Sequence, residues 1–125
     1  MKEKILIIDD SELVLVMAKD ALEQAGYRVL TATNGIEANR FIFSREKPDL
    51  IIMDIMMPML DGNKKAKLLK ENEVSRDIPI LLLSSKSEQE MRQLMAEAGA
   101  DGFILKPFTP KEITLGVESC LCGRK

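Results

Sequence analysis

Four stretches of the sequence place polar side chains directly after a short apolar run. Asp9 and Asp10 follow ILII, Asp54 follows LIIM, Ser84 follows ILLL, and Lys106 follows GFIL. If these runs are strands of one open α/β sheet, their carboxyl ends border the crevice where such sheets carry their functional groups. The pattern therefore predicts one site that gathers three carboxylates, a hydroxyl and an ammonium group.

The chemistry of this cluster indicates phosphoryl transfer beside a divalent cation. Carboxylates a few ångström apart repel one another, so a cation is needed to keep them ionised. Oxygen ligands without histidine or cysteine suit Mg²⁺ or Mn²⁺. The lysine and the serine would bind phosphoryl oxygens. Asp54, the only acid after the middle run, is the expected nucleophile, and its attack would give a labile acyl phosphate.

Each of these residues also has an ordinary structural interpretation when it is taken alone. Asp10, Ser11 or Ser84 could cap a helix, Asp54 could be a turn residue, and Lys106 could be a solvated charge. The prediction of a site rests on their joint occurrence at strand ends.

Five apolar runs predict the strands that position the cluster. They alternate little between apolar and polar residues, as expected for a parallel sheet covered on both faces. The runs span 5–8, 28–31, 50–53, 80–83 and 103–105. Only the second run ends without a charged residue, which favours an edge position for it.

Segments of helical period separate the runs and predict helices on both faces of the sheet. The first presents one apolar stripe ahead of Gly26, formed by Val14, Met17, Ala18, Ala21, Leu22 and Ala25. The others begin at Asn34-Gly35, span about 63–71, end at Gly99, and begin beside Pro110. The alternation predicts a (βα)5 domain over residues 1–125 with a doubly wound parallel sheet.

Composition narrows the classes of function. The chain has 125 residues and a net charge of -2, which suits one core and gives no basic field for nucleic acid. No apolar run approaches the roughly 20 residues of a membrane span, and the N-terminus lacks a signal-peptide layout, so we expect a cytoplasmic protein without membrane contact. With no histidine, imidazole bases are excluded, and Cys120 and Cys122 alone make no zinc site.

These motifs together resemble the receiver domain of bacterial two-component response regulators. The resemblance covers essentially the whole chain and rests on Asp9-Asp10, DIMMPMLDG around Asp54, Ser84 after IPILLL, and Lys106-Pro107 after GFIL. It implies a flavodoxin-like, five-stranded parallel sheet of order 2-1-3-4-5. Asp54 would be the phosphoacceptor, and Mg²⁺ or Mn²⁺ would bind to three carboxylates and one backbone carbonyl, those of Asp9 (partly through water), Asp10, Asp54 and Met56.

The resemblance also implies how the site acts as a switch. Ser84 and Lys106 would contact phosphoryl oxygens, and Phe103 would turn inward as Ser84 moves. The Lys106-Pro107 bond would be cis, a rare bond type that marks a shaped loop. Ser84 and Ser85 stand where the family more often has Thr and Ala, which we expect to tune rates.

The implied reaction is transfer from a phosphohistidine, on a sensor histidine kinase or a histidine phosphotransfer protein, followed by slow hydrolysis. The domain would catalyse both steps on itself without being a turnover enzyme. Met56 and Lys86 occupy positions that control water access in the family, and the apolar Met56 predicts an acyl phosphate that lasts longer than minutes.

Two surfaces are expected to bind partners. The predicted fourth helix, fifth strand and fifth helix would bind a protein target or form a homodimer, with Leu115 and Cys122 as candidate contacts, although partial burial also accounts for these two residues. Val16 lies opposite the apolar stripe of the first helix, and Leu13 and Leu15 flank it. This surface would dock the phosphodonor.

Three alternatives stay open at this stage. A Mg²⁺-dependent phosphatase with an aspartyl nucleophile usually has an acid two residues further on, where this chain has Met56. A flavin or nucleotide binder lacks its glycine-rich motif here, because neither GxGxxG nor GxxxxGK[ST] occurs. A degenerate receiver that only binds proteins is disfavoured by the complete set of site residues.

Overall fold

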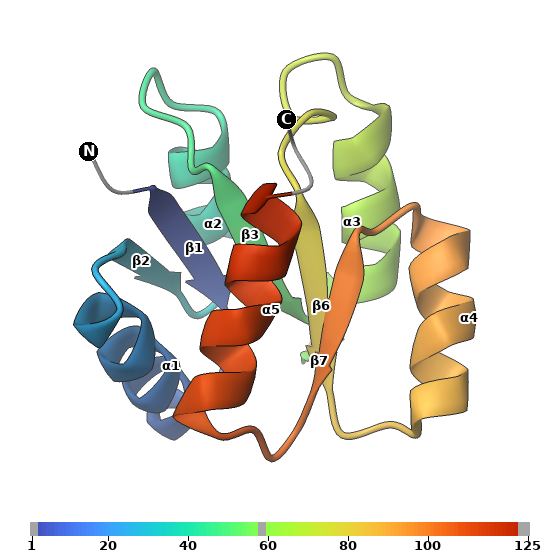
Figure 1. Ribbon diagram of the computed structural model, residues 1–125. Helices are drawn as coiled ribbons and strands as arrows, with labels where there is room; N and C mark the ends of the chain where they lie inside the picture. The colour runs from blue at the N-terminus through green and yellow to red at the C-terminus, as the bar shows by residue number, and fades with distance from the viewer. Residues whose placement is uncertain (1–2, 58–59, 123–125) are drawn as a thin grey trace.

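The computed structural model describes residues 3–57 and 60–122. Five parallel strands form one sheet in the order β2-β1-β3-β6-β7 (Figure 1). The strands are β1 (Lys4–Ile8), β2 (Arg28–Ala32), β3 (Leu50–Asp54), β6 (Ile80–Ser84) and β7 (Gly102–Leu105). Counted along this sheet alone, the order is 2-1-3-4-5, so the expected doubly wound sheet is confirmed, with β2 at its edge.

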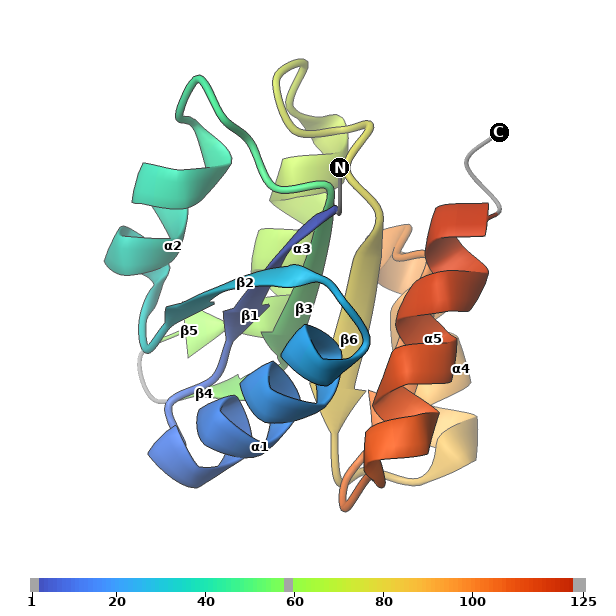
Figure 2. The ribbon, with the colours of Figure 1, turned by 60° about the vertical axis from the view of Figure 1, so that its left-hand side comes forward.

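Helices cover both faces of the sheet. They are α1 (Glu12–Gln24), α2 (Gly35–Ile42), α3 (Gly62–Glu71), α4 (Glu88–Ala98) and α5 (Pro110–Cys122). α1 and α5 pack on one face, and α2, α3 and α4 pack on the other (Figure 2). Because both faces are covered, every residue of β1, β3 and β6 is buried. This explains why these strands show little alternation in the sequence.

Local signals set the ends of the helices. The side chains of Ser11, Asn34 and Ser87 accept hydrogen bonds from the first turns of α1, α2 and α4, as N-caps do. Gly26 (φ 98°) and Gly99 (φ 72°) adopt the left-handed conformation after α1 and α4. The caps of α1 and α4 are thus Ser11 and Ser87, which leaves Asp10 and Ser84 free for another role.

The buried stripe of α1 differs in part from the predicted one. Leu15 is buried at 6% exposure, although we expected it beside the outward surface. Met17 is 46% exposed, and Ala25 is the exposed C-cap beyond the last turn. The side chains of α1 that are buried are Leu15, Ala18, Ala21 and Leu22, and the last three of these belong to the expected stripe.

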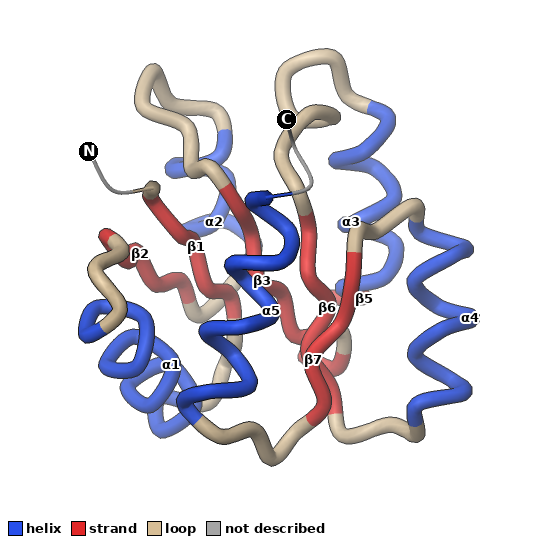
Figure 3. Tube along the Cα trace, in the orientation of Figure 1, coloured by secondary structure: helices blue, strands red, loops and turns tan. Residues whose placement is uncertain are grey.

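A short antiparallel pair follows β3 and was not predicted. β4 (Met56–Met57) pairs with β5 (Leu60–Asp61) in a sheet of its own (Figure 2). Figure 3 colours the helices blue and the strands red along the chain. Strands of two residues carry no periodicity that a sequence can show. The pair holds the segment after Asp54 in place. Within the described ranges, no helix has the length and apolar character of a membrane span.

Candidate functional site

The carboxyl ends of β1 and β3 bring three carboxylates together. Ile8 pairs with Met53 in adjacent parallel strands, so Asp9 and Asp54 emerge side by side. Carboxylate oxygens of Asp9, Asp10 and Asp54 all lie within 4.8 Å of one another. The acidic cluster predicted from the ends of the apolar runs is therefore present in the fold.

Lys106 joins this cluster from the far side of the sheet. Lys106 directly follows β7, which lies two strands away from β3 in the sheet. Its side chain extends back toward the end of β3. The ammonium Nζ lies 2.9 Å from Asp9 Oδ2 and 3.1 Å from Asp54 Oδ2. The Lys106-Pro107 bond is cis, as the resemblance implied.

The acids differ in burial and in hydrogen bonding. Asp9 and Asp54 are 0% and 4% exposed, whereas Asp10 is exposed. Asp54 Oδ1 accepts the Met56 backbone N–H at 2.9 Å, and Asp9 Oδ1 accepts that of Ser11 at 2.9 Å. Asp9 Oδ2 is ion-paired with Lys106 but accepts no hydrogen bond of suitable geometry. This buried oxygen therefore retains coordinating capacity.

Electrostatics oppose ionisation of the phosphoacceptor candidate. Burial raises the pKa of Asp54, the Met56 N–H lowers it, the nearby Asp9 raises it and Lys106 lowers it, and the net shift is upward. For Lys106, burial lowers the pKa, but Asp9 and Asp54 more than offset this, so its pKa is raised. Three carboxylates against one ammonium leave the site with two excess negative charges when all are ionised.

The donor set suits a hard divalent cation. Its ligands are oxygens, one of them the unsatisfied Asp9 Oδ2, and Mg²⁺ binds through a few carboxylates while keeping waters. The exposed Asp10 opens the cluster to solvent on one side. The residues present therefore fit Mg²⁺ or Mn²⁺, and a divalent cation would cancel the excess charge.

Of the two predicted switch residues, Ser84 lies at the carboxyl end of the strand next to β3, and Phe103 lies further back along β7. Ser84 ends β6, between β3 and β7, is 1% exposed, and its hydroxyl accepts the Lys86 N–H at 3.2 Å. Its carbonyl accepts the Lys106 N–H at 2.8 Å, which ties the two residues together. Phe103 lies on β7, is partly buried, and packs against the core formed with α2, α3 and α4.

Gly62 shapes the site in a way that sequence reasoning missed. At Asp61-Gly62, which end the DIMMPMLDG motif, the resemblance implies only a turn. A Cβ atom at Gly62 would lie 2.5 Å from the Asp54 carbonyl oxygen and 2.6 Å from Ile55 Cα, so α3 packs its first residue directly on the backbone of the acceptor strand. Asp61 also caps α3 by accepting the N–H groups of Asn63 and Lys64. A glycine just after an N-cap aspartate was the available signal.

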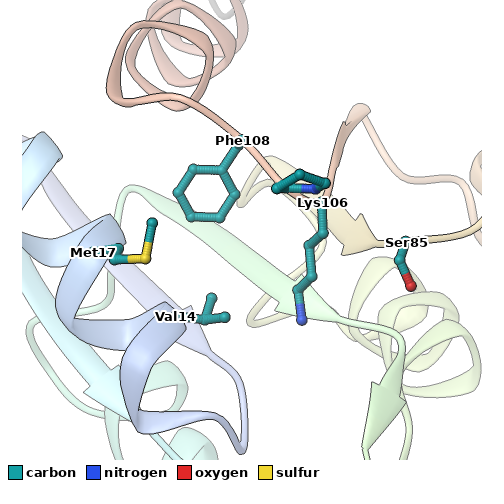
Figure 4. Close-up of a pocket in the computed structure, with 6 residues that line it drawn as sticks. Val14, Met17, Ser85, Lys106 and Phe108 are labelled. Atoms are coloured by element: carbon teal, nitrogen blue, oxygen red, sulfur yellow. The ribbon is translucent and has the colours of Figure 1, made fainter.

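An apolar hollow of about 230 Å³ lies next to Lys106. It is lined by Val14, Met17, Ser85, Lys106, Pro107 and Phe108. Figure 4 shows the Phe108 ring facing Met17 and Val14 of α1, with the Lys106 side chain directed away from them. Phe108 is 8% exposed and was not singled out from the sequence. The hollow lies between α1 and the segment from Lys106 to Phe108.

Known proteins share this arrangement. Residues 5–118 match the family model described as the response regulator receiver domain. The chain belongs to this family.

Among its relatives, the alkaline phosphatase synthesis transcriptional regulatory protein PhoP of Bacillus subtilis is 40% identical over 121 residues, which cover 97% of this chain and 49% of PhoP. The chemotaxis response regulator CheY4 of Vibrio cholerae has a similar structure, with TM-score 0.86, 31% identity, and coverage of 96% and 99%.

A third relative is the receiver domain of the sensor histidine kinase PA1611 of Pseudomonas aeruginosa, described with a magnesium ion in its active-site cleft. It has TM-score 0.83, 28% identity, and coverage of 98% and 99%. This chain spans about half the length of the curated relative PhoP. It is a response regulator receiver domain of a two-component system.

Proposed function

We propose that this receiver domain is a phosphorylation-dependent switch whose acceptor is Asp54 and whose metal is Mg²⁺. The observation that carries the proposal is the convergence of Asp9, Asp10 and Asp54 within 4.8 Å, with Lys106 bridging two of them. Neither the acids alone nor the lysine alone would indicate phosphoryl transfer.

In the proposed reaction, an Asp54 carboxylate oxygen attacks the phosphorus of a phosphohistidine. The new O–P bond forms as the P–N bond breaks, and the bonding pair stays on the leaving imidazole nitrogen. Lys106 exchanges its Asp54 contact for a phosphoryl oxygen, and the Ser84 hydroxyl donates a hydrogen bond to another. These groups stabilise charge on the transferred group.

Asp9, Asp10, Asp54 and the Met56 carbonyl would hold the metal. Mg²⁺ supplies positive charge that screens the acids from the incoming phosphoryl group. The chain's own contribution is to keep the acids close together, with Asp54 fixed by the Met56 N–H.

We propose further that the domain is not a turnover enzyme. A phosphatase with an aspartyl nucleophile needs an acid or base beside the nucleophile to complete each cycle. Met56 is at that position, is 60% exposed, and brings no titratable group. The acyl phosphate would then last longer than minutes, and a half-life of seconds in Mg²⁺ buffer would contradict this.

Two surfaces carry the proposed partners. Leu13 and Val16 of α1 are 69% and 64% exposed beside the site and would dock the phosphodonor, a histidine kinase or a phosphotransfer protein. The α4-β7-α5 face would bind a target or a second copy, with Phe103 reporting the state of Ser84. Leu115 is 52% exposed there, and Cys122 is exposed.

Incubation with Mg²⁺ and acetyl phosphate, followed by intact mass measurement, tests the proposal. The expected result is one added phosphoryl group on the wild-type protein and on Asp77→Asn, a control at an exposed carboxylate in the α3–β6 connection. Asp54→Asn should gain none. Steady consumption of acetyl phosphate without an adduct would support the phosphatase, and no reaction at all would support a binding module.

A further inference from the structure

The methionine next to the acidic cluster is unusually accessible. Within residues 3–57 and 60–122, Met56 is the most exposed methionine, at 60%, ahead of Met17 at 46%. Its neighbour Met57 is 7% exposed, and Met53 is 0% exposed. Solvent therefore reaches Met56 far more than it reaches Met53 or Met57.

The backbone holds Met56 in a fixed relation to the acceptor. Its N–H donates to Asp54 Oδ1 at 2.9 Å, and β4 pairs it with Asp61. The Met56 side chain therefore belongs to a residue that contacts the Asp54 carboxylate through its backbone, and it is exposed to solvent. A change in its polarity therefore acts where hydrolysis of an acyl phosphate would take place.

We infer that Met56 is a site of reversible oxidation by hydroperoxides and that its sulfoxide shortens the lifetime of the phosphorylated state; the second part rests on the proposed function. In the oxidation, a sulfur lone pair attacks one peroxide oxygen. An S–O bond forms and the O–O bond breaks. With hydrogen peroxide, the proton of the attacked oxygen passes to the second oxygen, which leaves as water. Sulfur is oxidised by two electrons and the peroxide is reduced by two.

The exposure of Met56 makes this oxidation compatible with the fold. A sulfoxide is polar, so it disrupts a core when it forms on a buried methionine. At Met56 the added oxygen faces solvent, and the core residues Met53 and Met57 are shielded from the reagent. Hydrogen peroxide is uncharged, so the carboxylates of Asp10 and Asp54 do not repel it.

The sulfoxide would add a hydrogen-bond acceptor where the thioether offers almost none. A strong acceptor on the rim of the site holds a water molecule beside Asp54 and polarises it toward the phosphorus. One net hydrogen bond changes a rate by between about twofold and tenfold. Hydrolysis of the acyl phosphate should accelerate by this factor.

To test the inference, the protein is treated with hydrogen peroxide, and the oxidised methionines are mapped by peptide mass spectrometry. The treated protein is then phosphorylated with acetyl phosphate and Mg²⁺, and its dephosphorylation rate is measured. Met56 should oxidise before Met17 and well before Met57. Oxidised wild type should dephosphorylate faster than untreated protein. Met56→Leu should show no difference between treated and untreated samples. Met17→Leu, which removes the other exposed methionine of the part of the chain that the structure describes, should respond as wild type does.

Treatment with methionine sulfoxide reductase should restore the slower rate, since it reduces the sulfoxide back to the thioether. Oxidation of Met17 ahead of Met56, or an unchanged rate in protein fully oxidised at Met56, would overturn the inference. A protein that takes up no phosphoryl group with or without peroxide would instead overturn the proposed function, while the mapping would still decide whether Met56 is the oxidation site.

Discussion

The position of Asp54 in the fold is electrostatically unfavourable for its ionised form. Burial raises its pKa above the ordinary value of 3.8, and the Asp9 charge adds to this, while the Met56 N–H and Lys106 compensate only in part. An ionised Asp54 is therefore less stable in the folded chain than in the unfolded chain. The acidic cluster suits a cation, and without one the charges of Asp9, Asp10 and Asp54 should destabilise the fold.

Asp54→Asn is expected to stabilise the metal-free protein at neutral pH. Because the folded pKa of Asp54 is raised, the stability linked to its protonation is present at low pH and is lost as pH rises through that pKa. Asparagine keeps the shape and removes the charge. In thermal unfolding at pH 7 with chelator present, the melting temperature of Asp54→Asn should exceed that of wild type by a few degrees. A gain of about 1 kcal/mol in the free energy of unfolding gives such a shift in a domain of this size.

The same comparison at acid pH is its internal control. Below the ordinary carboxylate pKa of 3.8, wild-type Asp54 is protonated in both states, so the advantage of the asparagine variant should disappear. An equal difference at every pH would show that packing, and not charge, causes the effect.

Gly62→Ala is expected to move the acceptor. The added methyl group would lie 2.5 Å from the Asp54 carbonyl oxygen, which is backbone and cannot rotate away. The variant should be destabilised by about 1–3 kcal/mol, as overpacked sites are, and should accept phosphoryl groups from acetyl phosphate more slowly. Denaturant unfolding and the intact-mass time course measure the two effects. Gly99→Ala is the control, because Gly99 has positive φ but open space around it, so it should lose stability without slowing phosphorylation.

At the level of elements, capping residues decide where helices begin, and α4 begins with a complete capping box. The Ser87 hydroxyl accepts the Glu90 N–H while the Glu90 carboxylate accepts the Ser87 N–H. Ser87→Ala removes one side of this capping box and should cost about 1 kcal/mol in the free energy of unfolding. Ser119→Ala, on the exposed face of α5, should change the free energy of unfolding little. An equal loss in both variants would show that the capping hydrogen bonds of Ser87 do not stabilise the fold.

The outward face of α1 carries the docking proposal. Val16→Glu puts a charge on a residue that is 64% exposed, so the fold should tolerate it. Transfer from a histidine kinase that phosphorylates the wild-type domain should slow by about tenfold or more. A tenfold effect corresponds to about 1.4 kcal/mol of lost docking free energy. Leu68→Glu, at a residue 65% exposed on α3, is the matched control and should leave transfer unchanged. Phosphorylation by acetyl phosphate should be equal in all three proteins. An unchanged kinase rate in Val16→Glu would end the docking proposal.

At the scale of the whole molecule, binding of the proposed cation would be coupled to folding. The acids come from β1 and β3 and their counter-charge from the segment after β7, so the cluster exists only in the folded chain. A metal that binds only the folded state should stabilise it, by about 2.7 kcal/mol at a concentration about 100 times its Kd. Melting temperature should rise with Mg²⁺ and not with NaCl at matched ionic strength, and Asp9→Asn should lose most of the response.

Local sequence patterns predicted most of the architecture. The five strands of the main sheet lie where their apolar runs are, to within a residue at each end. The signal is clearest for β1, β3 and β6, because strands buried on both faces are apolar at nearly every position. Gly26, Gly99 and Asn34 marked helix ends for equally local reasons. The polar residues at strand ends could be grouped because parallel strands all present their carboxyl ends to one side.

The tertiary structure alone decided the details that depend on distant atoms. The sequence could not tell that Leu15 is buried while Met17 is exposed, because the facing direction of α1 is set by where α5 packs beside it. Nor could it show that Gly62 lies against the backbone at Asp54, or that Lys106 bridges Asp9 and Asp54, because these contacts join residues of different elements. Spacing along the chain determined which groups reach the site, and packing in three dimensions determined how far apart they lie, since distances across a fold depend on every element between them.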